Sequence, residues 1–395
     1  MTKKNLVAIT GNDAAAYAIK QINPDVMAAY PITPQTDLVQ TFSEYVADGL
    51  VNTEFVTVES EHSAMSACVG AAAAGGRVMT ATSANGLALM FEIVYIAASN
   101  KLPIVMPVVN RALSGPINIH CDHSDSMAAR DAGWIQIYSE SAQEAYDNII
   151  QAIKIAENMK VRLPVMVMYD GFITSHGIEV VDFLDDKVVS EFIGDYKPNH
   201  PLLDTEKPLT YGPLDLYDFY FEHKRQQAED IKNSKPVILD VAREFKNISG
   251  REYKLFESYK LEDAETAIVA LSSTAGTAKA VVDELRDEGK KVGLLKPRVF
   301  RPFPYNELAE ALSHLKAVAI LDRSDSFGAF GGPVFTEIRS AMVEYGKMPE
   351  NINIIYGLGG RDINQQDLKN IYGQLGEIVE TGKVGDRIQY YGVRE

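Results

Sequence analysis

The sequence predicts an α/β protein built on parallel sheets. Short apolar strand patterns alternate with helical patterns between about residues 25 and 109, and a second alternation starts near residue 264. Strands that alternate with helices of this length indicate a parallel sheet covered by helices on both faces. Residues 182–261 break the alternation, so we expect a first domain at 1–181, a connector at 182–261 and a second domain at 262–395.

Size and charge limit the classes of protein that the chain can belong to. Its 395 residues exceed what one core usually supports. The 38 basic and 54 acidic residues give a net charge of −16 without a long basic run, which argues against nucleic acid and an anionic membrane as partners. The N-terminus lacks a signal-peptide pattern, and no apolar run approaches the ~20 residues of a membrane span. A cytoplasmic location is therefore expected.

The chain contains only two cysteines, Cys68 and Cys121. This number is too small for a disulfide framework or for an iron–sulfur cluster held within the chain. Cys68 is expected to be a small buried residue, and any iron–sulfur cluster must be carried by another chain.

The elements of the first unit follow one another closely. We expect strands at 25–30, 54–58, 77–82, 104–109 and 164–169, and helices at 37–46, 61–74, 86–99 and 141–158, the last opened by a capping box. The first strand ends at Pro31-Ile32-Thr33-Pro34. Because prolines restrict the backbone on both sides of Thr33, its hydroxyl is presented from a stiff turn.

Glu61 enters a helix whose wall consists largely of alanine. A carboxyl there has little water to solvate its charge, and desolvation favours the neutral form that can act as an acid. The alternative is that Glu59 or Glu61 only places negative charge in the first helical turn, where the helix dipole favours it. The small residues favour the first interpretation, since they let another surface approach closely.

Several polar residues follow predicted strands and are expected at one edge of the sheet, namely Thr33, Glu61, Asn85 and Arg111. Ligands of parallel sheets bind beyond the carboxyl ends of the strands. An arginine there can grip a carboxylate with two hydrogen bonds, although a surface ion pair is the alternative. The run His120-Cys121-Asp122-His123 matches no common zinc spacing. We expect no metal site, and a turn stabilised by Asp122 and Asp125.

The connector and the second unit carry weaker signals. Prolines and aromatic residues in 182–261 are too dense for a solvated linker and predict an arm and a helix packed on a neighbouring domain, with contact to another subunit left open. The second unit predicts strands at 266–271, 291–296 and 317–322 and a helix at 277–288. The turn at 272–276 favours a helix cap over an anion site. For Arg298 and Arg301 we expect structural pairing with acidic neighbours rather than contact with the phosphates of a ligand.

Motifs in order along nearly the whole chain resemble the alpha subunit of the pyruvate:ferredoxin oxidoreductase (pyruvate synthase) family. They are Tyr30–Pro34, Ser60-Glu61, Asn85-Gly86-Leu87, Asn110–Leu113, Asp122–Asp125, and Asp170-Gly171-Phe172 with Thr174-Ser175-His176. The resemblance implies a thiamine-diphosphate-binding, pyrimidine-type parallel-sheet domain followed by a transketolase C-terminal-like α/β domain. It also implies oxidative decarboxylation of a 2-oxoacid with coenzyme A, or the reverse synthesis, with electrons passing to ferredoxin.

The resemblance assigns roles to the residues at the sheet edge. Glu61 matches the catalytic glutamate that hydrogen-bonds the aminopyrimidine ring of the cofactor, and Thr33 and Arg111 match substrate-binding positions. Pro31, Ile32 and Asn85 are expected beside the cofactor, and Asn85 stands where many relatives carry glutamine.

One expected motif is missing from the sequence. The chain lacks the Gly-Asp-Gly and later Asn that hold Mg²⁺ and the diphosphate in thiamine enzymes, and Asp170-Gly171 lacks the leading glycine. The chain should therefore supply half a site. The resemblance implies a beta subunit with Mg²⁺, the diphosphate pocket and a [4Fe-4S] cluster, further gamma and delta ferredoxin-like subunits or fusions, and a dimer of heteromers.

The substrate is inferred from the residues around Arg111. Thr33 leaves room for a methyl ketone, and the loop after Arg111 resembles the pyruvate branch of the family, which favours pyruvate. The alternatives are the same chemistry on 2-oxobutyrate or oxalate, and a scaffold subunit without catalytic activity.

Overall fold

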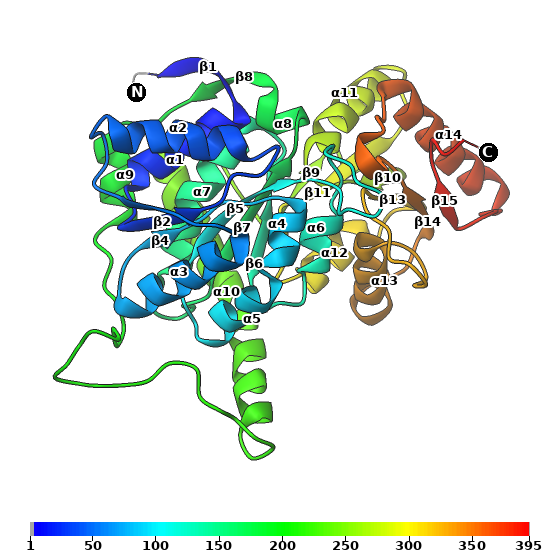
Figure 1. Cartoon of the computed structure of the whole chain (residues 1–395). Helices are drawn as coiled ribbons and strands as arrows, with labels where there is room; N and C mark the ends of the chain where they lie inside the picture. The colour runs from blue at the N-terminus through cyan, green and yellow to red at the C-terminus, as the bar shows by residue number, and fades with distance from the viewer. Residues whose placement is uncertain (1–3, 395) are drawn as a thin grey trace.

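The computed structural model describes residues 4–394, which form two large sheets side by side (Figure 1). The first sheet has seven strands in the order β12-β6-β7-β5-β4-β2-β3, and the second has six in the order β15-β14-β13-β10-β11-β9. Neighbouring strands are parallel except β12 and β9, which are antiparallel edge strands. A separate antiparallel pair joins β1 to β8. The predicted α/β class with parallel sheets is confirmed.

The elements of the first sheet and its helices span the following residues. The strands are β1 (Leu6–Thr10), β2 (Val26–Ala29), β3 (Glu54–Thr57), β4 (Val78–Met79), β5 (Val105–Asn110), β6 (Ile135–Tyr138), β7 (Val165–Asp170), β8 (Ile178–Asp182) and β12 (Val299–Arg301). The helices are α1 (Gly11–Ile22), α2 (Thr36–Ala47), α3 (Glu61–Ala74), α4 (Ala84–Leu89), α5 (Phe91–Ser99), α6 (Ser124–Ala128), α7 (Ala142–Ala156), α8 (Ile173–His176), α9 (Asp186–Ile193) and α10 (Tyr220–Ser249).

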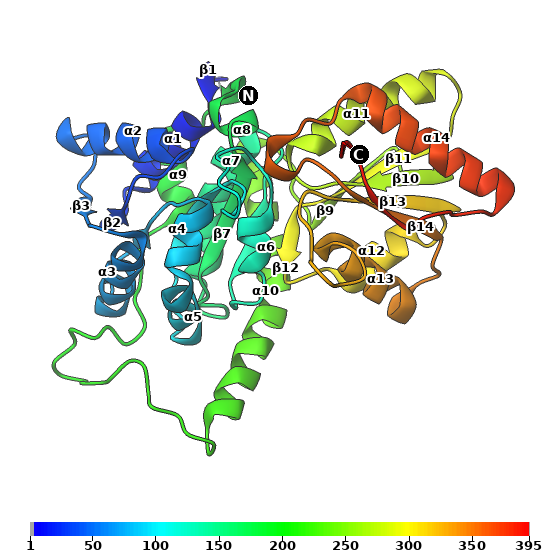
Figure 2. The ribbon, with the colours of Figure 1, turned by 45° about the vertical axis from the view of Figure 1, so that its right-hand side comes forward.

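The second sheet is built from the remaining chain (Figure 2). Its strands are β9 (Phe256–Tyr259), β10 (Thr266–Val269), β11 (Val292–Pro297), β13 (Ala317–Asp322), β14 (Glu350–Ile355) and β15 (Ile388–Tyr390). Its helices are α11 (Ser273–Asp287), α12 (Tyr305–Leu312), α13 (Pro333–Tyr345) and α14 (Gln365–Thr381), with a short 3₁₀ turn at Leu358–Gly360.

Several predicted elements differ from the structure. The helix expected at 86–99 is two helices, α4 and α5, separated at the buried Met90. The strand expected at 77–82 is shortened to β4, and Thr82 forms only an isolated bridge with Val108. Helix α11 begins at Ser273, four residues earlier than expected. Cys68 is fully buried as predicted, and this burial raises the pKa of its thiol to about 12.

The two sheets share one core. A single cluster of buried apolar side chains contains Met168 of β7, Phe300 of β12 and Ile320 of β13. Sheet membership also crosses the expected limit at residue 262, because β9 precedes it and lies in the second sheet, whereas β12 follows it and lies in the first. The domain limits themselves stay a prediction.

The connector consists of α9, an extended segment at 194–219 and the long helix α10. The extended segment is held to the first unit where the Leu202 N–H donates to the Ala73 carbonyl and the Gly212 N–H donates to Asn100. The N-terminal part of α10 stands away from the body (Figure 1). Large apolar side chains are exposed there, among them Leu214, Leu216, Tyr217, Phe219 and Phe221. Contact of this arm with another subunit, which the sequence leaves open, is a matter for the proposed function.

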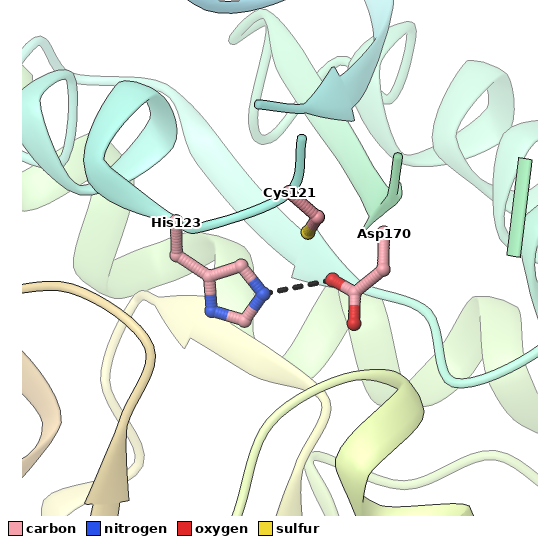
Figure 3. A group of neighbouring side chains, drawn as sticks. All are labelled: Cys121, His123 and Asp170. Atoms are coloured by element: carbon pink, nitrogen blue, oxygen red, sulfur yellow. Dashed lines mark hydrogen bonds and ion pairs between the residues drawn. The ribbon is translucent and has the colours of Figure 1, made fainter. Parts of the chain in front are cut away.

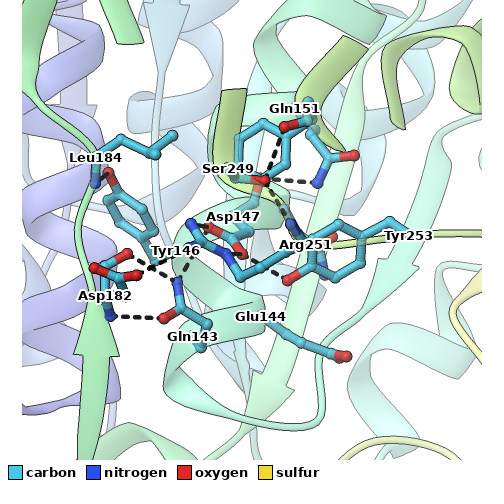
Figure 4. Close-up of polar contacts among 12 residues, drawn as sticks. Gln143, Glu144, Tyr146, Asp147, Gln151, Asp182, Leu184, Ser249, Arg251 and Tyr253 are labelled. Atoms are coloured by element: carbon cyan, nitrogen blue, oxygen red, sulfur yellow. Dashed lines mark hydrogen bonds and ion pairs between the residues drawn. The ribbon is translucent and has the colours of Figure 1, made fainter. Parts of the chain in front are cut away.

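After α10 the chain is fixed to α7 by a buried ion pair (Figure 4). Asp147 is fully buried, and it accepts hydrogen bonds from Nη2 of Arg251 at 2.8 Å and from the hydroxyl of Tyr253 at 2.6 Å. Burial raises the pKa of Asp147, and Arg251 opposes that rise. The pair therefore anchors to α7 the segment that runs from α10 to the second sheet.

Replacing Arg251 by methionine should therefore destabilise the chain strongly. Asp147 would be left as a buried charge without its cation, which costs about 3–5 kcal/mol. Urea unfolding followed by circular dichroism measures this loss. The matched control is Lys246→Met, because Lys246 pairs with the exposed Glu252 and an exposed pair contributes at most about 1 kcal/mol. Equal losses in both variants would contradict the assignment.

Candidate active site

The loops after β2, β3, β4 and β5 meet at the carboxyl edge of the first sheet, and we call residues 31–35, 58–61, 82–86 and 110–118 the rim. Gln35 is fully buried and joins the first loop to the segment after β4, since its Nε2 donates to the Ala81 carbonyl at 3.0 Å and its Oε1 accepts from the Ile32 N–H at 3.2 Å. Asn12 donates to the Pro34 carbonyl at 2.8 Å. The turn between the two prolines is thus held from both sides, with Pro31 and Thr33 exposed.

Arg111 joins the first and last loops of the rim. Its Nη1 donates to the Thr33 carbonyl at 2.9 Å, and its Nε donates to the Asn118 carbonyl at 3.0 Å. The residue is 6% exposed, and burial lowers the pKa of its guanidinium while Asp125 opposes that shift. Within residues 4–394 no carboxylate lies in ion-pair contact with Arg111, so the alternative of a surface ion pair is not found. The remaining N–H groups are suited to an anionic ligand.

Glu61 is the first residue of α3, after the cap Ser60, whose hydroxyl accepts from the Ser63 N–H. Its side chain is buried at 6% exposure, whereas Glu59 is exposed and accepts a hydrogen bond from the Ser63 hydroxyl. Glu59 therefore places its negative charge at the first turn of α3. This is the role that the alternative interpretation gave to Glu59 or Glu61. The carboxylate of Glu61 has no hydrogen bond or ion pair to the described residues.

A slot beside Glu61 depends on a glycine of α4. A Cβ at Gly86 would lie 2.8 Å from Oε1 of Glu61 and 2.4 Å from Oγ1 of Thr82, so a side chain there would displace the carboxylate. The hydroxyls of Thr82 and Ser83 are buried without a hydrogen-bond partner in the described part of the chain. Buried polar atoms are rarely left without a partner, which marks this slot as a place for a polar ligand.

Asn85 links α4 to the loop after Arg111. Its Nδ2 donates to the hydroxyl of Ser114 at 2.7 Å, and its Oδ1 accepts from the Ser114 N–H at 3.0 Å. Both ends of the amide therefore connect α4 to the loop after Arg111. A contact of Asn85 with the cofactor stays a prediction, as do the roles of Pro31 and Ile32.

A buried cluster of Cys121, His123 and Asp170 lies between the two sheets (Figure 3). Their ligand atoms lie within 4.8 Å of one another. Nε2 of His123 is 2.8 Å from Oδ1 of Asp170, and Oδ2 of Asp170 accepts from Arg323 at 3.1 Å and from the Ser273 N–H at 3.2 Å. Burial alone would raise the pKa of Asp170, but His123 and Arg323 hold it below its ordinary value. The carboxylate therefore acts as an ion-paired link between the sheets.

This cluster also explains the turn before α11. The Ser273 N–H at the start of the helix is occupied by the Asp170 carboxylate, so a protein carboxylate serves as the cap. Arg301 pairs with Glu337 at 2.6 Å, as the structural interpretation predicted. Arg298 is buried against the amides of Asn148 and Gln151 rather than against acids. Asp122 accepts from the Ser124 N–H at 3.0 Å and stabilises the expected turn.

Comparison with known families identifies the chain. The model described as pyruvate flavodoxin/ferredoxin oxidoreductase, thiamine diphosphate binding, matches residues 17–243, and the model of pyruvate:ferredoxin oxidoreductase core domain II matches residues 264–368. The chain belongs to the pyruvate:ferredoxin oxidoreductase family. It is thus an oxidoreductase subunit with a thiamine-diphosphate-binding domain, which confirms the resemblance that its motifs carry.

Curated relatives cover nearly the whole chain. The pyruvate synthase subunit PorA of Thermotoga maritima is 58% identical over 98% of each chain. The subunit of the same name from Methanocaldococcus jannaschii is 51% identical over 92% of this chain and 93% of that protein. The ketoisovalerate oxidoreductase subunit VorA of Pyrococcus horikoshii is 44% identical over 98% of each chain. The expected class, an alpha subunit of a 2-oxoacid:ferredoxin oxidoreductase, is confirmed.

Solved structures confirm the fold of this family member. The 2-oxoglutarate:ferredoxin oxidoreductase from Magnetococcus marinus matches with a TM-score of 0.72 and 19% identity, over 95% of this chain and 66% of that one. A split-gene transketolase matches with a TM-score of 0.55 and 13% identity, over 93% of this chain and 98% of that one. At these identities both likenesses concern the fold alone.

The rim fits one half of a thiamine diphosphate site. Beside Gly86, the Glu61 carboxyl and the Thr82 hydroxyl, both without a hydrogen-bond partner among the described residues, suit the pyrimidine end. Asp170, in contrast, already accepts from Arg323 and Ser273 and is not free to hold a metal and a diphosphate. The sequence did not point to Gln35, and it gave Gly86 only as part of a motif and Asp125 only a role in a turn. Only Gly86 carried a local signal, since glycine is unfavourable inside a helix.

Gly86→Ala should displace Glu61 from its slot. The added methyl group would overlap the Glu61 carboxyl, and overpacking of this kind costs about 1–3 kcal/mol. We expect a lower unfolding temperature and at least about tenfold slower 2-oxoacid-dependent reduction of ferredoxin by the complex. The control is Gly70→Ala in α3, because a Cβ at Gly70 meets no atom within 4 Å. Similar losses in both variants would show that the slot at Gly86 has no special importance.

Proposed function

We propose that this chain is the alpha subunit of a pyruvate:ferredoxin oxidoreductase. Pyruvate and coenzyme A give acetyl-CoA and CO2, two electrons pass to ferredoxin, and the reverse reaction synthesises pyruvate. The observation that carries the proposal is the buried guanidinium of Arg111, held beside Thr33 without a carboxylate partner among residues 4–394. A free cation of this kind suits the carboxylate of a 2-oxoacid.

Pyruvate is favoured over larger 2-oxoacids. The relatives named pyruvate synthase reach 58% identity, against 44% for the relative named ketoisovalerate oxidoreductase. The Thr33 side chain is short and exposed on the turn, which supports a small methyl ketone. The same chemistry on 2-oxobutyrate or oxalate remains the alternative substrate assignment, and a scaffold subunit remains the alternative without catalysis.

The residues of this chain would bind and orient the reactants. Thiamine diphosphate, when bound, supplies the carbon nucleophile and the electron sink for decarboxylation. Glu61 would share a proton with a ring nitrogen of the pyrimidine. Arg111 and Thr33 would hold the carboxylate and carbonyl oxygens of pyruvate so that its second carbon lies in attack geometry.

Partner chains would complete the site. The relatives are named as subunits, which supports a multi-subunit enzyme. We assign Mg²⁺, the diphosphate pocket and [4Fe-4S] clusters to a beta subunit and to gamma and delta ferredoxin-like chains, in a cytoplasmic dimer of heteromers that reduces ferredoxin. The exposed apolar side chains of segment 203–221 support contact with such a chain. Among residues 4–394, no helix combines the length and apolar character that crossing a membrane needs.

Glu61→Gln should slow the reaction severely. The amide keeps the size of the side chain but cannot share a proton as a carboxyl does, and loss of such a group reduces rates about 10²- to 10⁴-fold. Pyruvate-dependent ferredoxin reduction by the purified complex measures the effect. The matched control is Glu59→Gln, two residues away and exposed, which should retain the rate. An unchanged rate in Glu61→Gln would favour the scaffold alternative.

Arg111→Ala should weaken pyruvate binding selectively. Loss of charge-assisted hydrogen bonds to a carboxylate lowers kcat/KM about 10- to 100-fold. We expect this loss to appear in the KM for pyruvate, with the KM for coenzyme A as the internal control in the same preparation. Equal changes in both constants would remove Arg111 from the substrate site.

A further inference from the structure

The carboxylate of Asp125 lies beneath the rim and joins three loops. Its Oδ2 accepts from the N–H groups of Ala84 and Arg111, both at 3.0 Å. Its Oδ1 accepts from Nδ2 of Asn110 and from the Ser126 N–H, both at 2.7 Å. Asp125 is 1% exposed, so four hydrogen bonds take the place of water around one buried carboxylate.

The geometry requires a carboxylate at this position. Both donors to Oδ2 are backbone N–H groups, and an amide nitrogen in place of that oxygen would face them with further N–H groups. One donor belongs to Ala84, whose φ of +38° is unusual for a residue with a side chain. The bond to Asp125 therefore supports a strained start of α4, two residues before Gly86. Burial raises the pKa of Asp125 to about 6, and its hydrogen bonds oppose that rise.

Asp125 connects the two functional parts of the rim. On one side it fixes the backbone of Arg111, whose side chain reaches the Thr33 carbonyl. On the other side it fixes Ala84, and thereby the helical turn in which Gly86 contacts Glu61. The side chain of Asp125 thus sets the distance between the Arg111 guanidinium and the slot beside Glu61. The charge of Asp125 partly offsets the desolvation of Arg111.

We propose that Asp125 is a positioning residue for the 2-oxoacid, which holds Arg111 in register with the Glu61 slot. The proposal rests on the proposed function. Asp125 touches neither substrate nor cofactor in this role, because all its acceptor positions are directed at the protein. Its loss should act on the binding of the 2-oxoacid and leave the binding of coenzyme A unchanged.

The test compares two isosteric substitutions in the assembled complex, Asp125→Asn and Asp322→Asn. Asp322 is a matched control, because it is also 1% exposed and accepts from the Val334 N–H at 2.8 Å and the Phe335 N–H at 3.1 Å at the start of α13. Its position in the second sheet keeps it out of the rim. Both variants should lower the unfolding temperature.

Only Asp125→Asn should raise the KM for pyruvate, by at least about tenfold, the scale of one lost charge-assisted hydrogen bond. The KM for coenzyme A should stay within about twofold. Hydrogen exchange followed by mass spectrometry should show faster exchange in peptides from 83–90 and 110–118 in Asp125→Asn than in Asp322→Asn. A lower unfolding temperature with an unchanged KM for pyruvate would overturn the proposal.

Further variants cover the case in which Asp125→Asn fails to assemble. Asp125→Glu keeps the charge but moves it by one methylene, and Asn110→Ala removes one donor while the carboxylate remains. Each should raise the KM for pyruvate more than that for coenzyme A, and no change in either would overturn the proposal. Arg111→Ala separates the two levels of inference. If it leaves the KM for pyruvate unchanged, the proposed substrate site fails; if it raises that KM while the Asp125 variants do not, only the role of Asp125 fails.

Discussion

The buried carboxylate of Asp170 is the interaction on which the arrangement of the two sheets depends. It ends β7 of the first sheet and accepts from the start of α11 and from Arg323 after β13, both in the second unit. His123 contacts its other oxygen, and the His123 N–H donates to the Arg323 carbonyl at 2.8 Å. A buried charge is tolerated only while its partners are in place. The contacts of Asp170 therefore fix the position of one sheet relative to the other, in addition to the apolar core that the two sheets share.

At the rim of the first sheet, in contrast to Asp170, buried polar groups lack partners. Arg111 is a buried cation without a carboxylate partner, Glu61 is a buried acid without a donor, and the Thr82 and Ser83 hydroxyls lack partners within the described residues. Such groups are costly when left unsatisfied. The position of Glu61 and Arg111 at one edge of the sheet supports the proposal that a ligand completes the site there. Asp125 supplies the rigidity that such a site needs before its ligand arrives.

Local signals in the sequence were enough to predict much of the fold and the principal residues of the rim. Apolar periodicity predicted the parallel strands, because the central ones are buried on both faces and read as short apolar runs; the edge strand β3 is partly exposed. The prolines around Thr33 predicted a stiff turn, and the alanine-rich helix after Glu61 predicted a carboxyl with little water around it. These inferences hold because each depends on neighbours within a few positions along the chain.

The contacts between loops were decided only by the tertiary structure. The single helix expected at 86–99 breaks at Met90, and β12 leaves its expected domain to join the first sheet. The partners of Asp125 include Ala84, 41 positions away, and those of Asp170 include Arg323, 153 positions away. No local pattern encodes such distances, because a buried carboxylate accepts from whichever donors the packing of strands and helices brings to it. The sequence by itself predicted the central parallel strands, several of the helices and the chemical groups at their ends; the packing of the sheets decided which of those groups became paired and which were left without a partner among the described residues.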